Sequence, residues 1–138
     1  MKFTRREALA LGLGATAVAM LPMRASAAAD EAIAAFTGGA EVGEGGVTLT
    51  APEIAENGNT VPVSVDAPGA AAILILAMGN PTPGVAQFNF GPAAGSQAAS
   101  TRIRLAGTQD VVAIAKMADG SFAKAQSTVK VTIGGCGG

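Results

Sequence analysis

The residue most able to do chemistry in this sequence is a single cysteine close to its end. Cys136 is the only cysteine among 138 residues, and it stands in the run Gly134-Gly135-Cys136-Gly137-Gly138. A thiolate can form and exchange sulfur–sulfur bonds reversibly, which neither a hydroxyl nor an amine can do. With no second cysteine in the chain, this thiol either bonds to another molecule or stays reactive.

The glycines around Cys136 predict a carrier arm rather than a buried thiol. Glycine has no side chain that could shield or obstruct the sulfur. The preceding segment Val129–Ile133 alternates like a strand and would hold the arm to a folded domain. From Ile133 to Cys136 the chain can extend about 10 Å, enough to enter a cleft in another protein. We therefore expect residues 134–138 to be flexible. Bulky residues at Gly134 and Gly135 should slow loading of Cys136 without changing the melting temperature.

The composition excludes several classes of function. The chain has no histidine, which rules out histidine-based nucleophilic catalysis and histidine-ligated metal or haem. Removal of the first 27 residues would take four of nine basic and one of ten acidic residues, leaving a net charge of −4. A nucleic-acid-binding protein needs a basic surface, so we expect no such partner.

The remaining polar and sulfur-containing residues predict no metal or cofactor site. Met78 and Met117 could bind copper, but without histidine they are better interpreted as core residues. Paired-carboxylate catalysis is conceivable, but a solvated surface is the favoured interpretation for Glu41, Glu44, Glu53 and Glu56.

The first 27 residues have the pattern of an export signal. The pair Arg5-Arg6 precedes an apolar run from Ala8 to Leu21 that is too short to span a membrane. Paired arginines before a weakly hydrophobic core are typical of the bacterial twin-arginine pathway, with an ordinary secretory signal as the alternative. Cleavage would follow Ala25-Ser26-Ala27 or Ala27-Ala28-Ala29. We expect a periplasmic protein that is not held in a membrane.

Residues 28–133 predict an all-β domain with one short helix. Asp30–Phe36 has a helical pattern that Asp30 could cap, and a second helix-like patch precedes a turn at Glu56-Asn57-Gly58-Asn59. Alternating or continuous apolar runs then predict strands, with Asp119-Gly120 as a hairpin turn. About seven short strands at these spacings predict an immunoglobulin-like β-sandwich. The predicted strands are Val47–Thr50, Val61–Val65, Ala71–Met78, Gln87–Phe90, Thr101–Leu105, Val111–Lys116 and Phe122–Ile133.

Three features of these strands bear on binding. Pro62 indicates an edge position or the start of a strand. Arg102 and Arg104 share one strand face, which we interpret as solvated, although it could attract an anionic adduct or an acidic partner. The run Ala71–Met78 predicts a strand buried on both faces, and the sequence leaves open whether it belongs to the core or to a partner interface.

Four of these features together resemble the SoxY family, the sulfur-carrying subunits of bacterial thiosulfate oxidation. They are the twin-arginine signal, the stretch Ala51–Val63, the strand-rich body and the terminal Gly-Gly-Cys-Gly-Gly. The resemblance implies an immunoglobulin-like sandwich paired with the smaller SoxZ subunit. It also implies that Cys136 carries the substrate covalently while the SoxAX haem enzyme loads thiosulfate and the SoxB manganese hydrolase releases sulfate. A SoxCD sulfane dehydrogenase would act where that branch exists.

On this hypothesis the protein is a carrier and not an enzyme. The exposed thiol could also join two copies through a Cys136–Cys136 disulfide. The alternative is a non-catalytic immunoglobulin-like assembly module in which Cys136 makes a structural intermolecular disulfide. A thiol redox enzyme is disfavoured because no second cysteine could resolve a disulfide.

Overall fold

The computed structural model describes residues 24–134 and contains one helix and nine strands within that range. The helix is α2 (Arg24–Thr37). The first five strands are β1 (Val42–Glu44), β2 (Thr48–Thr50), β3 (Ile54–Asn57), β4 (Val61–Asp66) and β5 (Ala70–Ala77). The remaining four are β6 (Gly84–Asn89), β7 (Ala98–Ile103), β8 (Gln109–Met117) and β9 (Phe122–Ile133).

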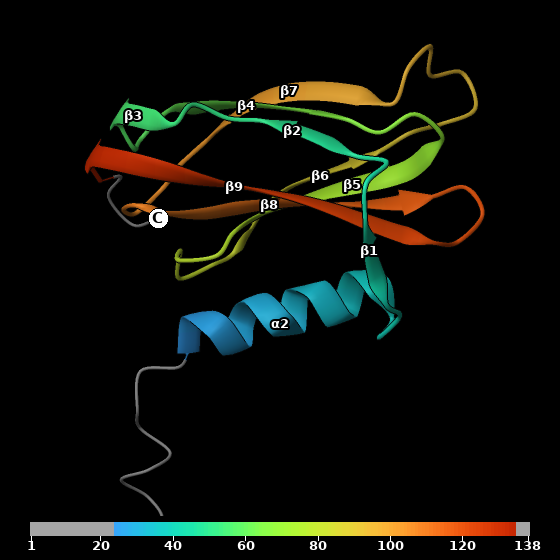
Figure 1. The fold of residues 1–138 in the computed structure, drawn as a ribbon, viewed down its shortest axis with the longest axis horizontal. Coiled ribbons are helices and arrows are strands. Elements are labelled where there is room, and N and C mark those ends of the chain that lie inside the picture. Colours follow the sequence, from blue (N-terminus) through green and yellow to red (C-terminus); the bar gives the residue numbers. More distant parts are fainter. Residues whose placement is uncertain (1–23, 135–138) are drawn as a thin grey trace, which may run out of the picture.

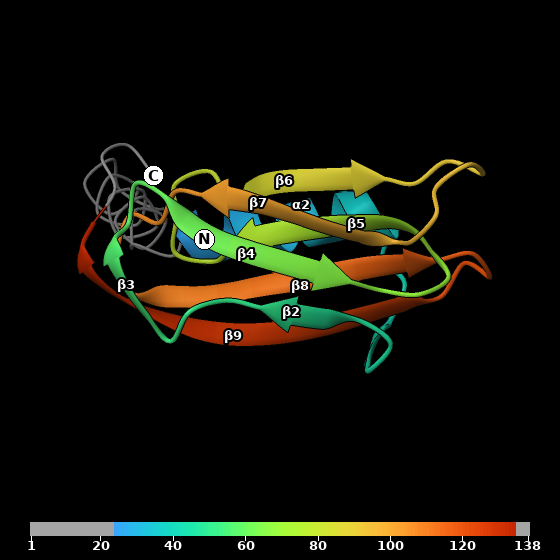
Figure 2. The same cartoon turned by 90° about the horizontal axis from the view of Figure 1, so that it is seen from above.

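The strands form two sheets that pack face to face, with the helix below the larger one (Figure 1). The larger sheet has the order β1-β9-β8-β5-β6, and the smaller has the order β2-β4-β7. β9 also pairs in parallel with β3 near its end. Figure 2 shows β4, β7 and β2 lying across the larger sheet. This two-layer arrangement confirms the predicted all-β sandwich of immunoglobulin-like type.

Strands β4 and β5 follow the two apolar patterns that predicted them. In β4 the buried Val61, Val63 and Val65 alternate with residues that are more exposed. The pairing of β2 with β4 stops at Ser64, so Pro62 lies near the start of β4, beyond the reach of β2. β5 is buried along almost its whole length, as its continuous apolar run predicts.

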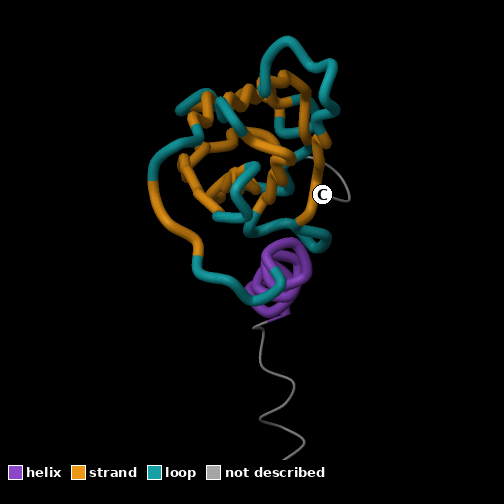
Figure 3. The backbone as a smooth tube through the Cα atoms, turned by 90° about the vertical axis from the view of Figure 1, so that its right-hand side faces the viewer, coloured by secondary structure: helices purple, strands orange, loops and turns teal. Residues whose placement is uncertain are grey.

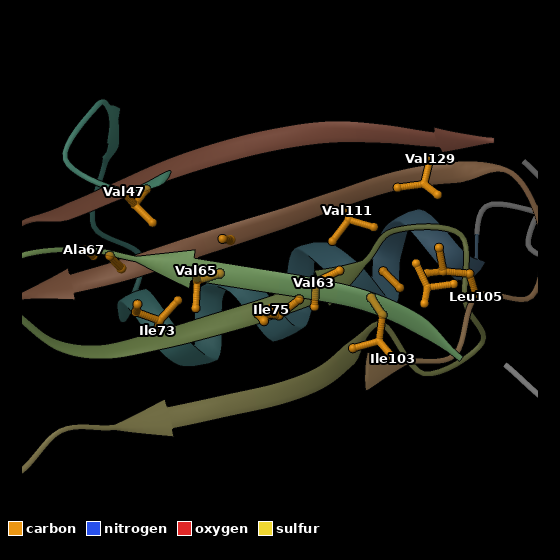
Figure 4. Close-up of a cluster of buried hydrophobic side chains, with 14 of the residues drawn as sticks. Val47, Val63, Val65, Ala67, Ile73, Ile75, Ile103, Leu105, Val111 and Val129 are labelled. Atoms are coloured by element: carbon orange, nitrogen blue, oxygen red, sulfur yellow. The ribbon is translucent and has the colours of Figure 1, made fainter. Parts of the chain in front are cut away.

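The main core lies between the two sheets (Figure 4). Ile73 and Ile75 of β5 are fully buried there against valines of β4. Burying a side chain of this size stabilises the fold by about 1.5–3 kcal/mol. Other members of this core include Val47, Ala67, Ile103, Leu105, Val111 and Val129.

Helix α2 covers the opposite face of the larger sheet (Figure 3). Leu74 and Leu76 of β5 point to this side and form a second apolar cluster, against which Ile33 and Phe36 of the helix pack. The rings of Phe36 and Phe122 meet edge to face, with centroids 5.9 Å apart. β5 therefore lies in the interior, between the other sheet and the helix. The run Ala71–Met78 thus belongs to the core, one of the two possibilities that the sequence left open.

The helix begins earlier than predicted. It starts at Arg24, so Asp30 lies inside it and does not cap its N-terminus. The run Ala27-Ala28-Ala29 explains the difference, because alanine has the highest helix propensity of all residues. Within residues 24–134, no helix has the length and apolar character needed to cross a membrane.

Two short strands were not predicted, and both pair in parallel with β9. β1 pairs with residues 122–124 and β3 with residues 130–133. The helix-like patch before Asn57 was a wrong prediction, because residues 54–57 form β3. Only Ala55 of β3 is buried, so the segment has no period-2 apolar pattern to reveal it.

Candidate functional site

The predicted attachment residue lies just beyond the part of the chain that the structure describes. Cys136, Gly135, Gly137 and Gly138 are outside it, as is most of the predicted export signal. Gly134 is inside it, two residues before Cys136 in the sequence. The site is therefore defined by the end of β9 and by the segments that surround Gly134.

The last residues of β9 are held by both neighbouring segments after β8 has ended. The ladder between β8 and β9 stops at Gln109 and Val129. Beyond it, Thr108 continues the contact: its Oγ1 accepts a hydrogen bond from the Val131 amide at 2.9 Å. On the other side β3 pairs with Lys130–Ile133, and the Thr132 hydroxyl donates to the Ala55 carbonyl at 3.1 Å.

The final carbonyl of β9 is also bonded. The Gly58 amide donates to the Ile133 carbonyl oxygen at 2.7 Å, and the Gly58 carbonyl accepts from the Leu105 amide at the same distance. Gly58 thus links the end of β9 to the loop between β7 and β8. These bonds secure the backbone up to the residue before Gly134.

Gly134 itself lies against that loop. A Cβ atom added at Gly134 would stand 2.3 Å from the carbonyl oxygen of Ala106, a separation that real Cβ atoms essentially never show. Its φ angle is not in the left-handed region, so the constraint is one of space and not of backbone conformation. Glycine is required here for close approach, a reason additional to the freedom expected of an arm. For Gly134 we therefore expect a bulky residue to lower the melting temperature, and not to leave it unchanged as the sequence alone suggested.

Two exposed isoleucines lie on the strands that end beside this point. Ile54 of β3 is 60% exposed and Ile133 of β9 is 68% exposed. Pro52, Ile54, Thr60 and Pro62 help to line a shallow surface hollow of roughly 300 Å³. Ile54 has no signal in the sequence, because the pattern of residues 54–57 does not predict a strand. Its pairing with β9 is visible only in three dimensions.

Both arginines have exposed side chains, but only Arg102 lies in a strand, because β7 ends at Ile103. Ile103 and Leu105 between and after them are buried, which confirms the alternation of this segment. Arg102 Nη1 donates to Thr60 Oγ1 at 3.5 Å. Arg104 begins the loop that carries Ala106. The interpretation as a solvated face agrees with this exposure.

The other predicted alternatives are not assembled into a site. Met78 packs against the apolar cluster between α2 and the larger sheet, and Met117 packs against the main core. The four glutamates considered for paired-carboxylate catalysis, Glu41, Glu44, Glu53 and Glu56, are all exposed. Within residues 24–134 no group of three or more histidine, cysteine, aspartate or glutamate side chains is placed to hold a metal ion.

Comparison with known proteins adds to this geometry. The sequence model described as "Sulfur oxidation protein SoxY" matches residues 33–136. The solved structure of the sulfur carrier protein SoxY from Chlorobium limicola f thiosulfatophilum is similar, with a TM-score of 0.68 and 39% identity. That match covers 78% of this chain and 99% of the other. No curated protein matches the sequence.

A superoxide reductase (neelaredoxin) from Ignicoccus hospitalis shares the fold alone. Its TM-score is 0.55 at 17% identity, and the match covers 63% of this chain and 80% of that one. The SoxY match shows more than a shared fold, because it combines 39% identity with nearly full coverage of the Chlorobium protein. The family match also extends to Cys136. On these grounds the chain belongs to the SoxY family of sulfur oxidation proteins.

Proposed function

We propose that the protein is a periplasmic sulfur carrier that holds thiosulfate-derived intermediates covalently on Cys136. The observation that carries this proposal is the extent of the family match, which runs from residue 33 through the sandwich and includes the lone cysteine. The description of the Chlorobium protein as a sulfur carrier supports it. So does the position of Cys136, two residues after Gly134, which follows a strand end that is hydrogen-bonded on both sides.

The chemistry requires little from the carrier beyond its thiol. In loading, the Cys136 thiol and thiosulfate form a sulfur–sulfur bond and lose one proton and two electrons. The electrons pass to a haem partner, which we propose is SoxAX. Water then cleaves the terminal sulfonate as sulfate and releases a proton, leaving a persulfide on Cys136. We propose SoxB for that hydrolysis and, where present, SoxCD for oxidation of the remaining sulfur.

The body would present Cys136 to these enzymes and not catalyse the steps itself. We propose that it does so as a heterodimer with SoxZ after export by the twin-arginine pathway. Because β5 is buried between the other sheet and α2, we propose that SoxZ contacts a different surface. A second copy joined through a Cys136–Cys136 disulfide would be an inactive side product, because it consumes the carrier thiol.

Intact-mass measurement of the protein from the periplasmic fraction tests the proposal. Incubation with thiosulfate and the haem partner should add the mass of a thiosulfonate to the wild-type chain, and reductant should remove it. Cys136→Ser should gain no mass while keeping the wild-type melting temperature and circular dichroism. A wild-type mass unchanged by this treatment would refute the carrier role. Weakened assembly of Cys136→Ser would then favour the structural-disulfide module.

A further inference from the structure

A buried asparagine organises the loop against which Gly134 lies. Asn80 follows β5 and is 0% exposed. Its Nδ2 donates to the Arg104 carbonyl at 2.7 Å, and its Oδ1 accepts from the Ala106 amide at 2.9 Å. One side chain therefore bonds the backbone of this loop at two points on either side of Leu105.

Gln109 completes the attachment of this loop. Its Nε2 donates to Asn80 Oδ1 at 2.8 Å and to the Gly107 carbonyl at 3.0 Å. Its Oε1 accepts from the Gly79 amide at 2.9 Å. No buried side-chain nitrogen or oxygen in the described residues lacks a hydrogen-bond partner. A buried polar network that is fully satisfied favours a single conformation.

Hydrogen bonds connect this loop to the end of β9. Leu105 donates to the Gly58 carbonyl, and Gly58 donates to the Ile133 carbonyl. The Ala106 carbonyl oxygen lies 2.3 Å from where a Cβ of Gly134 would be. Asn80 is thus connected to Gly134 through the loop backbone by hydrogen bonds and one close backbone contact.

We propose that Asn80 is a positioning residue for Cys136. By bonding the Arg104 carbonyl and the Ala106 amide, it holds the backbone that carries the Ala106 carbonyl, and so sets where and in which direction the chain leaves the body, two residues before the thiol. This inference rests on the proposed function, because positioning matters only if Cys136 must enter the active sites of other proteins. Misplacing a reacting group by about 1 Å can cost on the order of a hundredfold in rate.

Two variants and one matched control test this. Asn80→Leu keeps a similar shape and removes all three bonds of the amide. Gly134→Ala leaves Asn80 intact and forces Gly134 and Ala106 apart. Gly107→Ala is the control, because it lies in the same loop, has no positive φ, and its added Cβ would meet nothing within 4 Å. Circular dichroism confirms folding of each, and Gly134→Ala carries the test if Asn80→Leu does not fold.

The first readout needs no partner. Nitroxides on Cys136 and on Lys124→Cys, an exposed position of β9, report the distance between the body and the thiol by double electron–electron resonance. Both variants should shift or broaden the distance distribution, and Gly107→Ala should match the unsubstituted protein. Unchanged distributions in the folded variants would overturn the proposal.

The second readout separates positioning from general damage. Loading of Cys136 by the haem partner with thiosulfate should slow by about tenfold or more in both variants. Reaction with a small aromatic disulfide should stay within about twofold, because that reagent needs no docked geometry. Enzymatic loading at the wild-type rate would overturn the positioning role. Failure of the unsubstituted protein to load at all would instead refute the proposed function, and the distance measurement would still judge the role of Asn80.

Discussion

The backbone of Gly134 lies so close to the carbonyl oxygen of Ala106 that a Cβ atom would stand 2.3 Å away. The contact joins the end of the last strand to the loop between β7 and β8. It makes Gly134 part of the folded body, although the surrounding glycines suggest an arm. The close approach has consequences for stability as well as for the position of Cys136.

Gly134→Ala should lower the free energy of unfolding by about 1–3 kcal/mol, the usual cost of overpacking. The obstructing atom is backbone oxygen, so no side-chain rotation can relieve the contact. Chemical denaturation of the mature protein measures the change. Gly107→Ala, with open space around its Cβ, should differ from wild type by no more than about 1 kcal/mol. Equal stability of the two variants would show that the loop yields freely.

The docking of helix α2 predicts a second stability effect. Phe36 packs against Leu74 and Leu76 and meets Phe122 edge to face. Phe36→Ala should therefore destabilise the protein by about 2–4 kcal/mol, somewhat less than a fully buried phenylalanine because its side chain is only half-buried. Thermal and denaturant unfolding measure the change. Glu31→Gln, in the same helix but outside the cluster that Phe36 joins, is the control and should unfold like wild type. If Phe36→Ala did so too, the helix would not be docked against the sheet.

The β8–β9 hairpin predicts a pH effect. Asp119 Oδ1 accepts hydrogen bonds from the Ser121 hydroxyl at 2.6 Å and the Ser121 amide at 2.8 Å. The Ser121 hydroxyl first and its amide second hold the pKa of Asp119 below its ordinary 3.8. Because the folded pKa is lowered, the contribution to stability is present above the ordinary value. It is lost as pH falls through the folded pKa.

Carboxyl-carbon NMR titration of wild type and Ser121→Ala tests this sign. Ser121→Ala removes the hydroxyl but keeps the backbone donor, so the pKa of Asp119 should rise part of the way toward 3.8. The loss of hairpin stability on acidification should therefore be smaller in Ser121→Ala and be complete at a higher pH than in wild type. A pKa that fell on substitution would contradict the assignment of the hydroxyl as the main cause.

Local patterns predicted much of this fold. β4 shows a period of two, β5 is an unbroken apolar run, and Asp119-Gly120 marks a hairpin; the structure confirms all three. Each signal involves residues that are close in the chain. β1 and β3 were overlooked because three or four residues with at most one buried side chain carry no usable period, and both depend on pairing with the distant β9.

In the candidate site, too, the sequence predicts one part and the tertiary structure shows the other. Cys136 stands out in the sequence because a lone thiol among glycines is chemically distinct at any position in any fold, and its role as the attachment point remains a prediction. Nothing local connects Gly134 to Ala106, or Asn80 to either. Those residues are distant in the chain, and they meet only because β5, β8 and β9 are neighbours in one sheet. The sequence by itself thus determined the reactive group and most of the strands. Tertiary packing decided how the backbone before that group is held, since close approach depends on which distant segments meet.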